Sequence, residues 1–194
     1  VPGNRIVIHS CHPHVEFALR RQQAEPSFPV RFDQFSASFE FDVLSPGQVI
    51  DVDGTRVVAH AQRHAGGSYG WRFERAGKSL VYSTDSEHRL EDETEWAGFV
   101  AFFDRADVVV FDAMYSLADA ISVKADWGHS SNIVGVELCQ EAKVRKLVMF
   151  HHEPAYSDTQ IARILEETKR FEKITRSDHA VEVLSAWDGL ELTL

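Results

Sequence analysis

The first half of the chain alternates between apolar and polar residues in short runs, which is typical of half-buried β-strands. The runs are rich in Val, Ile, Phe, Tyr or Trp, and turn clusters with Gly or Pro separate most of them. This pattern predicts a first strand over residues 5–9 and then a meander of short antiparallel strands over residues 38–44, 48–52, 55–62, 69–74 and 79–84. A helix over residues 14–23, which ends before Pro26, is predicted after the first strand.

In the second half, longer helical patterns alternate with two continuously apolar runs that predict buried strands. Helices are predicted over residues 91–105, after "HSS" and from Ser157, with Ser130, Ser131 and Ser157 placed to cap two of them. The buried strands are 106–113 and 146–150. Residues 180–194 predict two edge strands joined at Asp188-Gly189. A sheet covered by helices indicates a fold of stacked α/β layers.

Composition limits the size of the fold and the class of partner. The chain has 194 residues with 44% apolar content, enough for a single domain over 1–194. Thirty acidic against twenty basic residues give a formal charge of −10, which makes nucleic-acid binding unlikely. The chain has no signal peptide and no twenty-residue apolar run, and its two cysteines are far apart. We therefore expect a cytoplasmic protein away from membranes, with a homodimer left open.

Five histidine and aspartate residues stand just past the ends of predicted strands or before a helix. Each of them alone is an ordinary turn former, helix cap or surface residue. Neighbouring strand ends converge at one edge of a sheet, however, and imidazole and carboxylate together suit Zn, Mn or Fe. These side chains are therefore the candidate site: His64, Asp85, Asp112, His129 and His151.

Four stretches around these residues resemble, in order, the phosphodiesterase-like branch of the metallo-β-lactamase fold that includes RNase Z. They are "QRHAGGSYGWRFE", "KSLVYSTDSEH", "ADVVVFDAMYS" with "DWGHSS", and "VRKLVMFHHEPAYSD". The resemblance implies an α/β fold, an αββα four-layer sandwich. It also implies that His64 and His151 are metal ligands and that Asp85 bridges two metal ions. It places Asp112 and His129 as the catalytic pair near the scissile phosphate.

The resemblance has one departure. The family's His-x-His-x-Asp-His signature, which supplies most of the metal ligands, is expected upstream of "PGNRI" and does not occur in this sequence. We expect the chain to be the family's domain without its first strands. The stretch "HSCHPH" (9–14) has three histidines and a cysteine but neither the Asp nor the order of that signature. It is interpreted as a polar strand-to-helix turn.

Other polar residues near the candidate site have structural interpretations. His152 is expected to point away from His151 if the strand persists. Glu87 and His88 are interpreted as part of a charged turn, with the mouth of the site as the alternative, and His60 as a structural residue on a strand.

The sequence thus predicts a metal-dependent hydrolase with two divalent ions, Zn foremost and Mn or Fe as alternatives, and little activity for this chain without the signature segment. The expected partner is a small phosphodiester, such as a cyclic nucleotide, because the chain is acidic and lacks a Lys/Arg-rich arm. Within enzymes, the alternative is a thioester, lactone or lactam hydrolase. The alternative from another class is a non-catalytic or metal-poor sensor or interaction module of the same fold.

Overall fold

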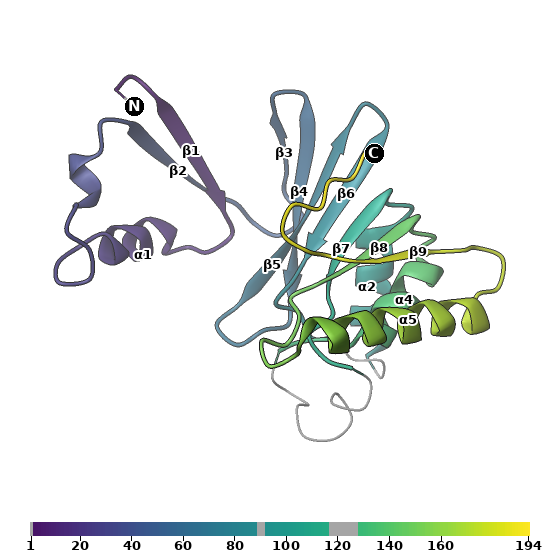
Figure 1. Cartoon of the computed structure of the whole chain (residues 1–194). Coiled ribbons are helices and arrows are strands. Elements are labelled where there is room, and N and C mark those ends of the chain that lie inside the picture. The colour runs from purple at the N-terminus through teal and green to yellow at the C-terminus, as the bar shows by residue number, and fades with distance from the viewer. Residues whose placement is uncertain (1, 89–91, 117–127) are drawn as a thin grey trace. The chain divides into compact units, whose positions relative to one another are not determined.

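The computed structural model describes residues 2–88, 92–116 and 128–194 (Figure 1). The chain forms two compact units, Val1–Gln48 and Val49–Leu194, and each is described by itself. The single domain expected over residues 1–194 stays a prediction.

The first unit contains two strands, one α-helix and one 3-10 helix: β1 (Arg5–Ser10), α1 (Val15–Gln22), η1 (Phe32–Gln34) and β2 (Ser38–Val43). The two strands pair in parallel, whereas residues 38–44 were predicted in an antiparallel meander. That pairing was wrong because the chain crosses over through α1 and η1 between the strands, and such a crossover returns the chain in the same direction. The buried Phe32 packs against Phe39, with 4.6 Å between ring centroids, and anchors η1 to the sheet.

The "HSCHPH" stretch forms the end of β1 and the turn into α1, as the sequence predicts. His9 Nδ1 lies 2.9 Å from Asp42 Oδ2 on the adjacent strand, and Cys11 is buried. The backbone N–H of His12 donates to Ser10 Oγ at 3.0 Å. This stretch therefore serves the first unit as a strand-to-helix connection.

The second unit is built on a seven-stranded sheet whose order follows the sequence. Its strands are β3 (Val49–Val52), β4 (Thr55–Gln62), β5 (Ser68–Arg75), β6 (Lys78–Ser83), β7 (Val108–Asp112), β8 (Lys146–Phe150) and β9 (Glu182–Ser185). From β3 to β6 neighbouring strands are antiparallel, which confirms the meander predicted for residues 48–84. From β6 to β9 they are parallel, because a helical crossover joins each pair.

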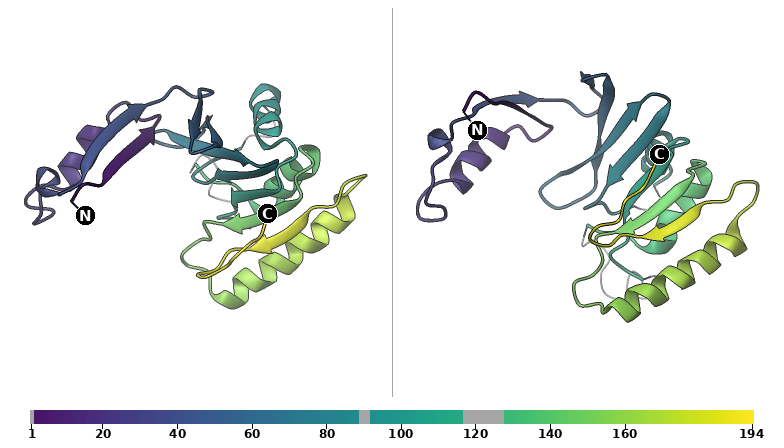
Figure 2. Two further views of the ribbon diagram at one scale, coloured as in Figure 1. Left: turned by 90° about the horizontal axis from the view of Figure 1, so that it is seen from above. Right: turned by 45° about the horizontal axis from the view of Figure 1, so that its top comes forward.

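Three helices in the described part of this unit pack on the sheet: α2 (Glu93–Phe103), α4 (Asn132–Glu141) and α5 (Asp158–Thr175). They gather on the same side of the sheet (Figure 2) and share one core with β6 to β9. In α4, Gly135 permits close packing, because a Cβ there would lie 2.7 Å from Phe111 Cδ1 of β7. The core includes Val81, Phe99, Phe103, Val109, Phe111, Leu138, Leu147 and Met149.

Side-chain caps begin the helices where the sequence predicts them. Ser131 Oγ accepts from Val134 N at 3.3 Å, and Ser157 Oγ accepts from Gln160 N at 3.4 Å. Ser130, which was also expected to cap α4, makes other hydrogen bonds that are described below. These caps satisfy backbone N–H groups that a helix cannot pair internally.

The expected pair of C-terminal edge strands is half right. β9 forms, and a turn follows it in which Leu190 N donates to Trp187 O at 3.1 Å. Residues 191–194 do not pair as a second strand. Three of these four residues are exposed, and an edge hairpin that buries little apolar surface is marginal in water.

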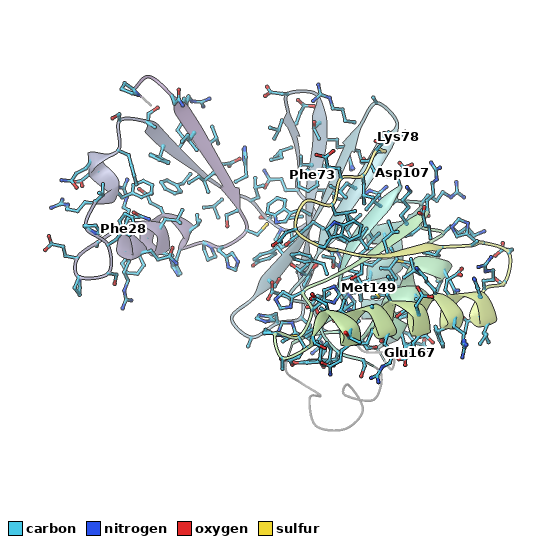
Figure 3. All side chains as sticks on the ribbon, viewed as in Figure 1. Phe28, Phe73, Lys78, Asp107, Met149 and Glu167 are labelled. Carbon is cyan, nitrogen blue, oxygen red and sulfur yellow. The ribbon has the colours of Figure 1, made fainter. Side chains whose placement is uncertain are left out.

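The two ends of the strands in this sheet carry different side chains. At the starts of β6 and β7, Lys78 Nζ lies 3.7 Å from Asp107 Oδ1 (Figure 3), and Asp107 Oδ2 accepts from Ser79 N at 2.9 Å. Arg145 Nη1 also donates to Asp107 Oδ1 at 2.9 Å, so the mostly buried Asp107 holds a small charge cluster where these strands begin. The candidate site residues lie at the opposite ends of these strands.

Candidate metal centre

The five candidate residues come together at one edge of the sheet because of strand direction. β6, β7 and β8 are parallel, so Asp85, Asp112 and His151 follow or close three strands that end at the same edge. Two antiparallel pairings separate β4 from β6, so β4 runs the same way and delivers His64 to that edge. His129 lies before α4, which packs behind β7 and β8. The structure thus brings all five together.

Asp85 is the centre of this arrangement. Its Oδ1 atom lies 3.8 Å from His64 Nε2 and 3.6 Å from His151 Nε2. Two ligand atoms about 2.0–2.1 Å from one tetrahedral zinc ion lie roughly 3.3 Å apart. The observed separations are a few tenths of an ångström wider, so small side-chain movements would bring either pair onto an ion. One carboxylate between two imidazoles is a geometry in which it can bridge two cations.

The ligand-type atoms form two overlapping groups. His64, Asp85 and His129 make one group, and Asp112, His129 and His151 make the other, with the atoms of each group within 4.8 Å of one another. His129 belongs to both groups and is the residue that joins them.

A buried nitrogen of His151 supports the fit to a metal ion. Its Nδ1 atom is buried without a hydrogen-bond partner among the described residues, and Asp112 Oδ1 is 4.0 Å away. An unpaired buried polar atom costs about 1–3 kcal/mol. This one nitrogen faces the Asp112 carboxylate, and a cation between them would satisfy both, so the residues present fit a divalent metal.

Asp112 holds His129 through a direct hydrogen bond. Asp112 is fully buried, and its Oδ2 lies 2.8 Å from His129 Nδ1. The backbone N–H groups of Ser86 and Met114 also donate to this carboxylate, at 3.2 Å each. The hydrogen bond to Asp112 raises the pKa of His129, although burial of the ring acts in the opposite direction. The pair therefore favours a ring whose Nδ1 carries the proton shared in this hydrogen bond. Nε2 is then left to contact a substrate or a metal ion.

His64 is oriented by the backbone. Its Nδ1 atom lies 2.9 Å from Ala65 O, and because a carbonyl only accepts, the ring carries its proton on Nδ1. The Nε2 lone pair is left for a metal ion, as is usual for histidine ligands. Gly128 packs against this ring with φ +85°, and a Cβ there would lie 2.7 Å from His64 Cδ2. Glycine before His129 therefore makes room for His64.

The backbone is strained at two of these residues. Asp85 has φ +54° and His151 has φ +58°, a left-handed conformation that non-glycine residues seldom adopt. Such strain costs of order 1–3 kcal/mol and persists only where the surrounding structure imposes it. The two side chains meet in this conformation, with Asp85 Oδ1 3.6 Å from His151 Nε2. Both strained residues are proposed metal ligands.

Sequence reasoning missed the two residues after Ser86. His88 was interpreted as part of a charged turn, but it is buried in the apolar core between Phe99 and Phe111. Glu87 Oε2 accepts from Gly128 N at 3.1 Å, so it supports the loop before His129. No local signal marks this burial, because the neighbouring sequence "DSEHRLEDE" is strongly polar.

The structural interpretations of His60 and His152 agree with their surroundings. His60 stacks on Phe102, with 4.8 Å between ring centroids, and burial lowers its pKa. His152 Nε2 lies 3.0 Å from Ser185 Oγ of β9. Burial, and to a lesser degree the neighbouring His151, lowers the pKa of His152.

Comparison with known proteins decides the family. The model of the Beta-lactamase superfamily domain matches residues 2–152, most of the chain. The chain belongs to this superfamily. The superfamily consists in general of metal-dependent hydrolases that bind divalent ions. No curated protein matches the chain.

Solved structures share the superfamily fold at low sequence identity. YhfI from Bacillus subtilis, a metallo-beta-lactamase fold protein, has a TM-score of 0.68 and 15% identity over 96% of this chain. Unliganded yeast PDE1 has a TM-score of 0.69 and 13% identity over 95%. The short form of human tRNase Z has a TM-score of 0.60 and 17% identity over 97%. These matches confirm the predicted α/β metallo-β-lactamase fold.

The chain is shorter than these structures. It spans 64% of YhfI, 59% of yeast PDE1 and 67% of human tRNase Z. No helix in the described residues combines the length and apolarity that crossing a bilayer requires.

Proposed function

We propose that this protein hydrolyses a small phosphodiester, such as a cyclic nucleotide, with two divalent metal ions. The observation that carries the proposal is the approach of His64 Nε2 and His151 Nε2 to the same oxygen of Asp85. Imidazole and carboxylate ligands favour zinc, and manganese or iron accepts the same set. Three side chains do not fill the coordination of two ions. The resemblance assigns the remaining ligands to the family's His-x-His-x-Asp-His segment.

When bound, the two cations would lower the pKa of a water molecule and offset the charge that develops on the phosphate. The residues of this chain then have separate tasks. Asp112 accepts a hydrogen bond from His129 Nδ1, which fixes the ring and favours its protonated form. His129 is thereby prepared to donate a proton or a hydrogen bond from Nε2 to a phosphate oxygen or the leaving oxygen.

Charge supports a small substrate over a polynucleotide. The formal charge of −10 repels a polyanion, and Arg63, which directly precedes His64, is engaged by Glu95 at 2.7 Å. A single phosphodiester carries one negative charge that bound cations offset. A cytoplasmic location and a homodimer stay predictions.

Hydrolysis of four substrate types by the purified full-length protein tests the proposal. Bis(p-nitrophenyl) phosphate, a cyclic nucleotide, an acyl thioester and a lactone would be assayed with zinc or manganese, and with a chelator as control. The expected result is metal-dependent cleavage of the two phosphodiesters. Cleavage of the thioester or lactone alone would replace the substrate class. Absence of turnover with metal bound would favour a sensor or interaction module.

A further inference from the structure

His88 follows Asp85 by three residues and is buried in the apolar core next to the candidate site. Only 8% of the residue is exposed, and its ring centroid is 4.2 Å from that of Phe99 and 5.0 Å from that of Phe111. Burial, and to a lesser degree the nearby His60, lowers the pKa of His88 to about 3. The imidazole is therefore neutral at physiological pH. A phenyl ring would suit these apolar walls as well, so packing alone does not explain a histidine.

The hydrogen bonds of His88 fix its tautomer. Ser130 Oγ donates its one proton to Ser86 O at 2.7 Å. Ser130 Oγ can then only accept from His88 Nδ1, which lies 2.6 Å away, so the ring proton is on Nδ1. The other nitrogen, Nε2, is left to accept from Ser86 Oγ at 3.4 Å. A neutral histidine satisfies both serines at once.

The two serines are adjacent in sequence to the proposed chemistry. Ser86 follows Asp85, and its backbone N–H also donates to Asp112. Ser130 follows His129. His88 therefore joins the segment that carries the proposed bridging carboxylate to the segment that carries the proposed acid. The connection passes through the core and needs no contact with substrate.

We propose that His88 is a positioning residue that holds Asp85 and His129 in register through Ser86 and Ser130. The proposal rests on the proposed function, because it assigns those two residues their roles. The competing explanation is that His88 only fills the core. His60 supplies a matched control, because its ring also packs against Phe99, at 4.9 Å, and against Phe102, but it makes no hydrogen bond to either serine in the described part of the chain.

Three variants separate positioning from packing. His88→Phe keeps a ring in the core but removes both hydrogen bonds. His88→Asn keeps a donor near the position of Nδ1 and removes the ring. His60→Phe changes another ring that packs against Phe99 and removes no hydrogen bond to the two serines. We expect His88→Phe to lower kcat by about 10–100-fold, the usual effect of removing a residue that orients a metal site, with little change in KM. His88→Asn should recover most of kcat despite its lower melting temperature, and His60→Phe should keep kcat.

Ser130→Ala provides a second variant should His88→Phe fail to fold. It removes the acceptor for His88 Nδ1 while leaving the ring in place. We expect the same loss of kcat, and the double variant should lose no more than the more impaired single variant, because both changes break one connection. Additive losses, or equal kcat in His88→Phe and His60→Phe, would overturn the proposal.

A readout independent of turnover keeps this test separate from the proposed function. Nitrogen-15 NMR of the histidine rings should show His88 as the neutral Nδ1-H tautomer in the wild-type protein. Calorimetric titration with zinc should show affinity lowered about 10–100-fold by His88→Phe and unchanged by His60→Phe. If the wild-type protein bound zinc but cleaved no phosphodiester, the proposed function would be wrong. The tautomer and the zinc affinities would still test the positioning role of His88. An Nε2-H tautomer, or unchanged affinity in His88→Phe, would contradict it.

Discussion

His129 Nδ1 lies 2.8 Å from Asp112 Oδ2, and the carboxylate that holds this histidine is fully buried. The carboxylate also accepts two backbone N–H groups, so its position does not depend on the histidine. This hydrogen bond fixes Nδ1 of His129 and leaves Nε2 to contact the substrate. It resembles in role a buried aspartate that orients a catalytic imidazole, and it can be tested by changing the acceptor alone.

Asp112→Asn should reduce phosphodiester turnover by roughly 10²–10⁴-fold with most of the metal retained. The asparagine amide can present a donor toward Nδ1, which selects the wrong tautomer, and it no longer raises the pKa of His129. Turnover and zinc content of the variant would be measured together. Wild-type turnover in Asp112→Asn would show that the hydrogen bond does not serve catalysis.

Gly128→Ala should weaken zinc binding because the new methyl group would press on His64. A Cβ at Gly128 meets His64 Cδ2 at 2.7 Å, and φ is +85°. Gly54→Ala is the matched control, since Gly54 has φ +77° and nothing within 4 Å of its added Cβ. Both variants should lose about 1–2 kcal/mol of unfolding free energy from the left-handed backbone. Zinc titration should show lower affinity in Gly128→Ala only, and equal affinities would contradict the packing argument.

Acid should destabilise the protein partly through His88. Its pKa is lowered to about 3 in the folded state, against 6.5 for an exposed histidine. Below pH 6.5 the unfolded chain binds a proton that the folded protein does not. The free energy of unfolding that depends on a neutral His88 is therefore fully present above pH 6.5 and is lost as the pH falls toward 3. Between pH 7 and pH 5 the loss amounts to about 2 kcal/mol.

Urea unfolding of the wild-type protein and His88→Phe at several pH values isolates this effect. The other histidines are present in both proteins, including His129, whose raised pKa acts with the opposite sign. The variant should therefore lose less unfolding free energy than the wild-type protein between pH 7 and pH 5. Parallel pH profiles would mean that His88 protonates in the folded state as readily as in the unfolded chain.

Much of the candidate site could be predicted because it depends on strand direction. The apolar runs before Asp85, Asp112 and His151 mark strand ends, and parallel strands bring those ends to one edge. His88 could not be found in this way. Its burial depends on Phe99 of α2 and Phe111 of β7, which lie next to it only after those elements pack. The sequence around it is polar and predicts an exposed turn.

The pairing errors have a similar origin. Strand periodicity predicted β2 as a strand but could not show that it pairs with β1 in parallel, because pairing depends on the path of the connection. The "HSCHPH" stretch, with its high density of ligand-type residues, forms a strand-to-helix turn in which His9 pairs with Asp42. The order and placement of residues were thus more informative about the site than their density.

The central claim is that Asp85 holds metal while His129 acts on substrate, and the zinc content of two variants tests it most directly. Asp107→Ala, which changes an aspartate at the opposite edge of the sheet, is the control for stability and should keep its zinc. Elemental analysis of the purified full-length proteins would be combined with phosphodiesterase kinetics. Asp85→Ala should lose zinc and activity together. His129→Ala should keep its zinc and lose roughly a hundredfold or more in turnover. Equal loss of zinc in both variants would make His129 a ligand, and unchanged zinc and rate in both would contradict the hydrolase assignment.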